Sequence, residues 1–302
     1  MTALEQYVRN LTSPECIGFC AARSGVPPVR VRQRLADYAG EVGIGVRLLE
    51  SVPLTGGRVL EIGAGLGLLA VWLKRQGVSI VLLEPGEGGF DENRRLLNAL
   101  LEWLDASDAT VLSIGAEELD AEHHGRFDVI FSVNVLEHIP RLESALAGML
   151  RVLAPGGVMR HTCPNYAVPY EPHYGMPLVP LIPRATSAVV RSLRDQPLWR
   201  SLNFVTYQRI VRFCGAEGLA CRFDRGLLAE AFTRVESDPA FRARRGPAVR
   251  TAARLLRASG AVSLLRTVPP RWATPMAFTC WRTGDRTSRS TITPFPPACA
   301  RP

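Results

Sequence analysis

The stretch "VLEIGAGLGLLAVWL", residues 59–73, decides the fold because it joins an apolar run, an acid, a cluster of glycines and a second apolar run. Gly63, Gly65 and Gly67 occupy every second position directly after Glu61. Glycine in an ordered element costs roughly 0.5–1 kcal/mol relative to alanine. Three together indicate a sharply bent backbone between a strand and a helix, with a ligand lying against it.

Short apolar runs alternate with helical patterns on the C-terminal side of this turn. Runs that are apolar on both faces are typical of buried parallel strands, and the helices between them supply the crossovers. The sequence therefore predicts a doubly wound α/β fold. The predicted strands are 58–63, 78–85, 109–115, 126–134, 158–164, 219–226 and 275–284, and the predicted helices are 31–52, 66–77, 90–104, 141–157 and 206–218.

The chain outside this pattern has several additions. Residues 1–55 are predicted to form a helical N-terminal extension before a main domain at 56–284. That domain is interrupted by a proline- and aromatic-rich insertion at 164–205 and by an arginine-rich helical insertion at 227–268. The polar, proline-rich residues 285–302 are expected to be disordered.

Composition sets limits on partners and location. The 302 residues are 47% hydrophobic and carry a net charge of +8. No apolar run reaches the ~18–20 residues that a membrane span needs. The start, "MTALEQYVRN", has no apolar signal region, so we expect a cytoplasmic protein. The seven cysteines are scattered, which favours reduced thiols over a zinc site.

Two carboxylates indicate which ligand the turn binds. Its spacing is G-x-G-x-G, whereas a dinucleotide-binding turn reads G-x-G-x-x-G. Glu61 beside the turn repels phosphate but suits S-adenosylmethionine, which carries a sulfonium and an ammonium. Glu84 ends the second predicted strand, where a carboxylate accepts the two ribose hydroxyls. Alternatively, Glu61 only faces the helix dipole and Glu84 is a solvated acid at a strand end.

Five blocks, in this order and spacing, resemble the class I S-adenosylmethionine-dependent methyltransferases of the type 11/12 kind. They are "VLEIGAGLG", "LLEP", "GAEEL", "FDVIFSVNVLEHI" and "LRVLAPGGVM", which span residues 58 to about 164. The resemblance implies a Rossmann-like, mostly parallel sheet of seven strands with the last strand antiparallel. It also implies S-adenosyl-L-methionine as cofactor.

The same resemblance assigns cofactor-binding residues. At Gly115, where many relatives have an acid, the contact to the adenine amino group would fall to Glu117 or to a main-chain carbonyl. The implied residues are Glu61, Gly63, Ala64, Gly65 and Gly67 at the methionine and ribose end, Glu84 at the ribose hydroxyls, Ala116 and Glu117 at the adenine, and Asn134 and Val135 at the methionine moiety.

Methyl transfer to a hydroxyl also needs a base near the C-terminal edge of the sheet. His138 follows the fourth predicted strand, and Glu171 and His173 follow the fifth in "CPNYAVPYEPHYG". These three are the predicted catalytic residues. Alternatively, His138 caps the next helix or bonds to the backbone, and the loop is a structural cover.

A metal is not expected at this site. In quinone-type O-methyltransferases, which this segment resembles, an acid–histidine pair is associated with a divalent ion. Glu137 and His138 match that pair, but Asn134 stands where a further acid would be needed.

The sequence thus predicts a methyltransferase that acts on a small molecule, by O-methylation of a metabolite, sugar or lipid-linked species. An RNA methyltransferase is the alternative, opposed by the lack of an N-P-P-Y or D-P-P-Y block. The turn spacing opposes an NAD-dependent oxidoreductase, and the polar cluster at 161–174 opposes a catalytically silent scaffold. The acceptor and the oligomeric state are left open. Six arginines of the second insertion either grip a phosphate-bearing acceptor or form a solvated face; they are Arg242, Arg244, Arg245, Arg250, Arg254 and Arg257.

Overall fold

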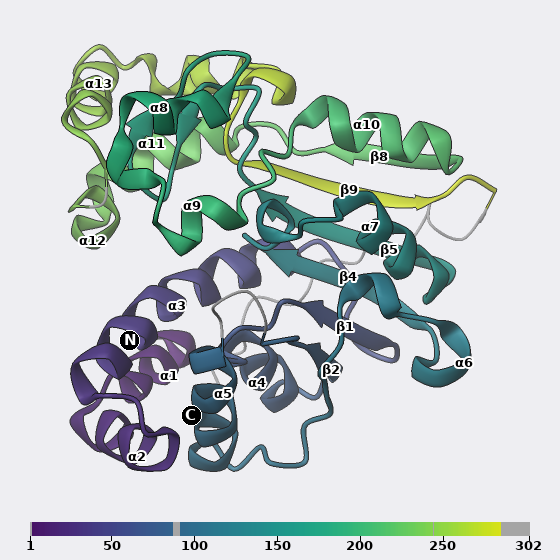
Figure 1. Ribbon diagram of the computed structural model, residues 1–302. Helices are drawn as coiled ribbons and strands as arrows, with labels where there is room; N and C mark the ends of the chain where they lie inside the picture. Colours follow the sequence, from purple (N-terminus) through teal and green to yellow (C-terminus); the bar gives the residue numbers. More distant parts are fainter. Residues whose placement is uncertain (1, 87–90, 244, 285–302) are drawn as a thin grey trace. The chain divides into compact units, whose positions relative to one another are not determined.

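The computed structural model describes residues 2–86, 91–243 and 245–284 (Figure 1). A seven-stranded sheet has the order β3-β2-β1-β4-β5-β9-β8. The strands β1, β2, β3 and β4 pair in parallel, and β9 runs antiparallel to β8. This confirms the predicted fold class. The strand bounds are β1 Arg58–Ile62, β2 Ser79–Leu83, β3 Val111–Leu112, β4 Phe127–Val133, β5 Leu153–Cys163, β8 Leu219–Phe223 and β9 Met276–Arg282.

The parallel register brings the carboxyl ends of four strands to one edge of the sheet. Glu61 of β1 pairs with Leu82 of β2 and with Phe131 of β4. Each of these central strands is buried over most of its length, as the continuous apolar runs predict. The loops that follow β1, β2, β3 and β4 therefore emerge side by side, where open α/β sheets bind ligands.

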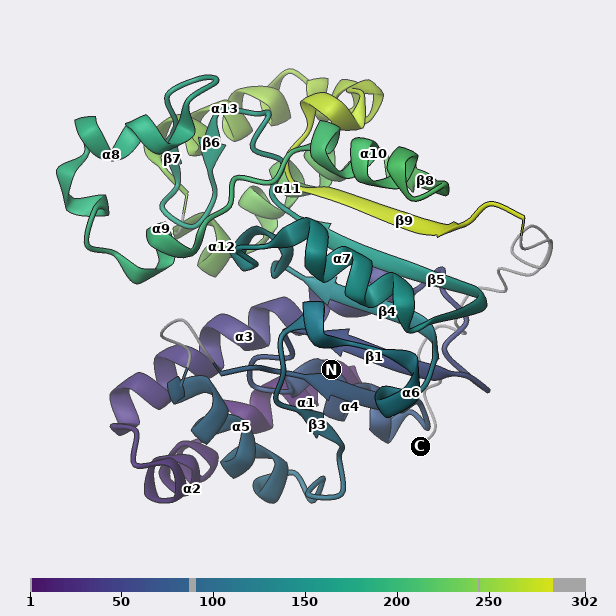
Figure 2. The same ribbon diagram turned by 45° about the vertical axis from the view of Figure 1, so that its right-hand side comes forward.

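The described residues form two compact units, which are considered separately below. Unit 1 comprises 2–135, 143–160 and 284, and unit 2 comprises 136–142 and 161–283. In unit 1, α4 packs on β2 and α3 packs on β4 (Figure 2). The helices of unit 1 are α1 Ala3–Leu11, α2 Pro14–Ser24, α3 Pro28–Leu49, α4 Leu68–Arg75, α5 Asp91–Trp103, the 3-10 turn η1 Ala116–Glu118, α6 Ala121–His124 and α7 Leu142–Arg151.

The predicted boundary between the helix at 141–157 and the strand at 158–164 differs from the structure. The helix expected at 141–157 ends at Arg151, and β5 begins at Leu153 rather than at 158. Pro155 lies at the start of this strand, where a missing N–H is tolerated. Gly157 packs so tightly that an added Cβ would lie 2.9 Å from the carbonyl oxygen of Asp128 in β4, so this segment belongs to the sheet.

The first helical region is more regular than its glycines indicate. The sequence pattern weakens at Gly40, Gly43 and Gly45, yet α3 continues through all three for 22 residues. An added Cβ at Gly45 would lie 2.1 Å from a methyl carbon of Leu69 in α4. The glycine therefore lets α3 approach α4 closely, and this packing offsets its low helix propensity.

Unit 2 contains the two segments that the sequence predicts to be insertions, 164–205 and 227–268. Asn165 ties the proline-rich segment to the chain before β9, because its Nδ2 donates to the carbonyls of Arg271 and Ala273 at 3.1 and 3.0 Å. Its elements are η2 Leu136–His138, the hairpin β6 Tyr170–Glu171 and β7 Met176–Pro177, η3 Pro183–Ala185, α8 Thr186–Val189, η4 Arg191–Leu193, α9 Pro197–Ser201, α10 Tyr207–Ala216, α11 Leu227–Ser237, α12 Pro239–Ala243, α13 Pro247–Ala258, η5 Ala261–Thr267 and η6 Pro270–Trp272.

Two sequence-based expectations concern the chain ends and membranes. The disordered tail predicted at 285–302 lies outside the described residues. Among the residues that are described, no helix is both long enough and apolar enough to cross a bilayer.

Candidate active site

The glycine turn after β1 is a bent, side-chain-free corner at the edge of the sheet. Gly63, Gly65 and Gly67 have φ of +65°, +57° and +70°, in the left-handed region that favours glycine. An added Cβ would lie 2.5 Å from Val135 at Gly63 and 2.2 Å from the Tyr38 ring at Gly65. Helix α4 begins at the next residue, Leu68, so the turn leads directly into the helix N-terminus.

Glu84 after β2 is bound into this turn. Its Oε2 accepts a hydrogen bond from the Gly65 N–H at 2.7 Å, and its Oε1 accepts one from the Gly86 N–H at 3.3 Å. The side chain is buried. Burial raises the pKa of Glu84, and the two backbone donors oppose that rise. The Glu84 carboxylate, which follows β2, therefore helps to hold the backbone of the turn that follows β1.

Glu61 at the end of β1 is a buried acid that lacks a full set of partners. Its Oε2 has no hydrogen-bond partner within the described residues. Burial, followed by the nearby charges of Glu84 and Glu41, raises the pKa of Glu61 to about 8. A buried carboxylate without a cation is costly. A ligand that brings a positive charge would relieve this cost, so the residues present fit a cationic donor.

The loops after β4 and β3 complete the edge. Asn134 adopts a φ of +53° and its Nδ2 donates to Oε1 of Glu41 in α3 at 3.1 Å. Val135 lies against Gly63, as the crowding at that glycine shows. Ala116 is buried in η1 and Glu117 follows it after β3. Asn134 and Val135 thus follow β4, a direct neighbour of β1, whereas Ala116 and Glu117 follow β3, which lies beyond β2.

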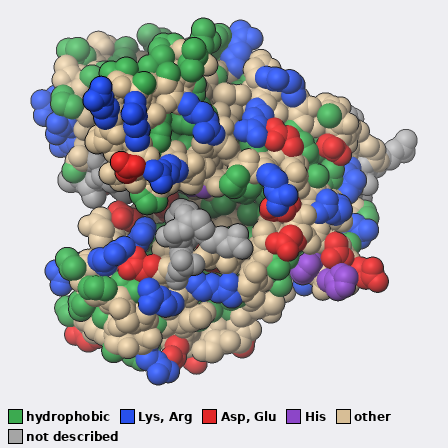
Figure 3. Space-filling view, in the orientation of Figure 1, with side chains coloured by type: hydrophobic (Ala, Val, Ile, Leu, Met, Phe, Trp, Pro, Cys, Tyr) green, Lys and Arg blue, Asp and Glu red, His purple; other side chains and the backbone are tan. Residues whose placement is uncertain are grey.

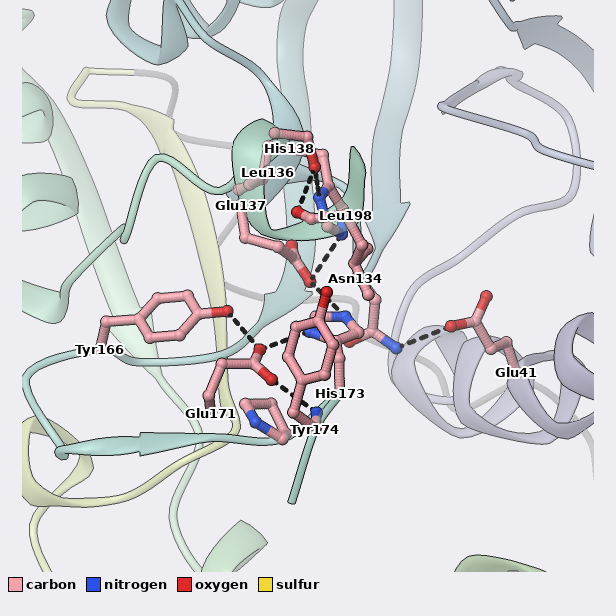
Figure 4. A network of polar contacts seen from close by, with 12 residues as sticks. Glu41, Asn134, Leu136, Glu137, His138, Tyr166, Glu171, His173, Tyr174 and Leu198 are labelled. Carbon is pink, nitrogen blue, oxygen red and sulfur yellow. Dashed lines mark hydrogen bonds and ion pairs between the residues drawn. The ribbon is translucent and has the colours of Figure 1, made fainter. Parts of the chain in front are cut away.

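A second polar cluster lies in unit 2, on η2 and the β6–β7 hairpin (Figure 4). Glu137 is fully buried, and its Oε1 lies 4.0 Å from His138 Nε2 and 3.9 Å from His173 Nε2. The two imidazole rings are 5.3 Å apart. Glu171, also fully buried, accepts a hydrogen bond from His173 Nδ1 at 2.6 Å and one from the Tyr166 hydroxyl at 3.0 Å.

The hydrogen bonds define the roles of the ring nitrogens. The Ser201 hydroxyl donates to the Leu198 carbonyl at 2.8 Å, so it accepts from His138 Nδ1 at 2.8 Å. Burial, and then the charge of His173, lowers the pKa of His138 to about 3, which keeps that ring neutral. His173 differs because a carboxylate lies beside each of its two nitrogens, Glu171 at 2.6 Å from Nδ1 and Glu137 at 3.9 Å from Nε2.

The same three side chains can also act as metal ligands. Glu137, His138 and His173 each offer one atom, and these atoms lie within 4.8 Å of one another. The expectation that no metal binds here stays a prediction.

Comparison with known proteins identifies the family. Residues 31–232, well over half of the chain, match the family described as "Methyltransferase domain". The chain belongs to this family. The methyltransferase is 36% identical over 213 residues to an uncharacterized protein of Mycobacterium tuberculosis, a match that covers 66% of this chain and 71% of that protein. The resemblance to class I S-adenosylmethionine-dependent methyltransferases is therefore confirmed.

Functionally named relatives match a shorter part of the methyltransferase. The ubiquinone biosynthesis O-methyltransferase of Pseudomonas aeruginosa is 33% identical over 109 residues, which cover 36% of this chain and 44% of that enzyme. Among solved structures, phosphoethanolamine N-methyltransferase 2 of Haemonchus contortus in complex with S-adenosyl-L-methionine has a TM-score of 0.47 at 15% identity. That match covers 93% of this chain and 59% of the other.

In the structure the predicted site residues form two groups. The ten predicted cofactor residues lie at or after the C-terminal ends of β1 to β4 in unit 1, and the three predicted catalytic residues lie together in unit 2. The chain passes from one group to the other between Val135 and Leu136. His161, in the same predicted polar cluster, instead stays in β5, buried against Phe278 with ring centroids 5.5 Å apart.

Three residues that were not predicted as cofactor-binding or catalytic residues belong to these groups. Tyr38 and Glu41 of α3 contact the glycine turn and Asn134. Glu137, considered only as half of a metal pair, lies between the two histidines. The available signal for Tyr38 and Glu41 was weak, because nothing local in 31–52 indicates which helix residues reach the turn.

Proposed function

We propose that this methyltransferase binds S-adenosylmethionine at the glycine turn and methylates a hydroxyl of a small-molecule acceptor, with His173 as the proton acceptor. The observation that carries the proposal is the Glu171–His173 pair, a 2.6 Å hydrogen bond between a buried carboxylate and an imidazole. The O-methyltransferase name of a partial relative supports oxygen as the acceptor atom.

The donor site supports the first half of the proposal. The left-handed glycine turn follows β1 directly, and Glu61 offers a carboxylate oxygen without a hydrogen-bond partner among the described residues to an ammonium group. When bound, S-adenosylmethionine supplies a methyl group that is already activated by its sulfonium. The chain's own task is then to orient the acceptor and to remove its proton.

The histidine pair supports the second half. Glu171 accepts a hydrogen bond from the Nδ1–H of His173. In the neutral ring the lone pair is then on Nε2. S-adenosylmethionine would give up its methyl group and keep the electron pair of the broken bond on sulfur, and His173 Nε2 would take the proton that the acceptor hydroxyl loses. Glu171 and Glu137 stabilise the resulting imidazolium.

The test is transfer of a radiolabelled methyl group from S-adenosylmethionine to a panel of catechols, phenols, hydroxylated sugars and a short RNA. We expect label on one or more small hydroxylated compounds and none on the RNA. We also expect EDTA treatment to leave the rate unchanged, because the Glu171–His173 pair needs no ion. Labelled RNA would contradict a small-molecule acceptor. Activity that is lost to EDTA and restored by a divalent ion would contradict a reaction without a metal.

Replacing Glu61 by glutamine is expected to change stability and donor affinity in opposite directions. The folded-state pKa of Glu61 is about 8, above the ordinary 4.5, so ionisation is disfavoured by folding. Wild-type stability should therefore fall as the pH rises between these values, at about 1.4 kcal/mol per unit. The Glu61→Gln protein lacks this pH-dependent loss of stability. At pH 8 it should therefore melt at a higher temperature than the wild type.

The same change should weaken donor binding, because the ammonium loses its charged partner. Calorimetry should show an affinity for S-adenosylhomocysteine that is lower by roughly tenfold or more. Wild-type binding at pH 7 should release a proton, which appears as a heat that depends on the buffer. Unchanged affinity together with raised stability would show that Glu61 is only a helix-dipole partner.

A further inference from the structure

Positive charge is concentrated in unit 2. Residues 136–142 and 161–283 contain 19 arginines, no lysine and eight acidic residues, a net charge of +11 with neutral histidines. The whole chain has a net charge of only +8, so the remaining residues are net acidic. Such an asymmetry indicates an anionic partner for unit 2.

Exposed apolar side chains are concentrated in the same unit. Eight large hydrophobic side chains of the described residues are exposed, and six of them belong to unit 2. Arginine side chains alternate with apolar ones over α8 and α13 in the space-filling view (Figure 3). The six are Leu181, Ile182, Val189, Leu255, Leu264 and Trp272, with exposed fractions of 60% or more.

Helix α13 shows this mixture on its outward stripe. Its inward stripe, at 249, 252, 253 and 256, is buried or half-buried, and its outward stripe at 251, 254, 255 and 258 is exposed. A solvated outer stripe would be polar throughout. Here Arg254 stands beside Leu255, which is 65% exposed, and the adjacent Arg257 is exposed as well.

The chain after α13 continues the pattern. The turn η5 packs on α11 and α13, and it exposes Leu264 and Arg266. In η6, Trp272 is 60% exposed, and the Arg271 guanidinium lies 5.8 Å from the centre of its indole ring. Tryptophan and arginine together are typical of the interface between water and acyl chains.

We propose that α13, η5 and η6 dock on the surface of an anionic lipid bilayer. The arginines meet lipid phosphates, and Leu255, Leu264 and Trp272 enter the headgroup region. A nucleic acid would also attract the arginines, but it offers no apolar medium for two leucines and a tryptophan. This inference is independent of the proposed reaction, because it concerns binding alone.

Vesicle flotation tests the proposal with the full chain. The probes are vesicles of phosphatidylcholine and vesicles that contain 30% phosphatidylglycerol. We compare the wild type with a triple variant, Leu255→Ser, Leu264→Ser and Trp272→Ser, which keeps the net charge. The matched control is Val29→Ser in unit 1, where the valine is 74% exposed. Circular dichroism and melting temperature verify that each variant folds.

The wild type should bind the anionic vesicles and not the neutral ones, and Val29→Ser should bind equally well. The triple variant should partition roughly tenfold or more weakly. Replacing Arg254 and Arg257 by glutamine should cost roughly fivefold for each arginine.

Absence of wild-type binding to the anionic vesicles would overturn the proposal. So would a triple variant that binds them as tightly as the wild type. Tight binding of a single-stranded RNA that the serine changes leave intact, without vesicle binding, would assign the surface to nucleic acid instead.

Discussion

Replacing Gly65 by valine is expected to reduce affinity for S-adenosylhomocysteine by about 100-fold or more. The residue has a φ of +57°, where a side chain is strained by about 1–2 kcal/mol. Its Cβ would also lie 2.2 Å from the Tyr38 ring, so the turn must move. Movement breaks the bond from Gly65 N to Glu84, a charge-assisted contact worth about 1.5–3 kcal/mol.

Gly77→Val is the matched control, because Gly77 has a φ of +82° but nothing within 4 Å of an added Cβ. Both variants should lose a few degrees of melting temperature from backbone strain, and Gly65→Val should lose more because it also disturbs the contacts with Tyr38 and Glu84. Only Gly65→Val should lose binding in calorimetry. If its affinity equals that of the wild type, the donor does not bind at this turn.

The turn could be predicted from sequence because its signals are local. Strand β1 is a continuous apolar run, and three glycines in five residues leave few other interpretations. Glu84 could be predicted for the same reason, since it ends the next apolar run. Once strands alternate with helices, the right-handed crossover rule brings these two ends to one edge. The family match then confirms the methyltransferase family that these short stretches indicate.

The contacts of α3 could not be predicted, because they depend on packing between distant segments. The side chain of Tyr38 reaches Gly65 only because α3 is unbroken, and α3 is unbroken because Gly45 packs tightly on Leu69. The helix end at Arg151 has a similar origin, in the pairing of β5 with the rest of the sheet. Neither packing contact leaves a periodic signal in the sequence.

The proximity of His138 and His173 could be predicted only in part. The sequence placed both after successive strands, so a shared sheet edge was predictable. It did not indicate that Glu137 would lie 3.9–4.0 Å from both Nε2 atoms. From sequence, a carboxylate next to a histidine can be interpreted as a core residue or as a metal ligand. The position of Glu137 beside His173 becomes clear only once the β6–β7 hairpin is placed in the structure.

Replacing His173 by glutamine is expected to lower kcat for hydroxyl methylation by roughly 10²–10⁴-fold. Glutamine removes the imidazole whose Nε2 would accept the proton, but its side-chain amide can still donate to Glu171, so the buried carboxylate keeps a partner. Donor affinity should stay at the wild-type value. The measurement is single-turnover methyl transfer to whichever acceptor the panel identifies, beside calorimetry with S-adenosylhomocysteine.

Tyr166→Phe is the matched control, since it removes one 3.0 Å hydrogen bond to the same Glu171 oxygen without touching an imidazole. Its rate should fall by less than roughly tenfold, the value of one such bond. A glutamine variant that keeps the full rate would remove His173 from the reaction and leave the cluster a structural role only.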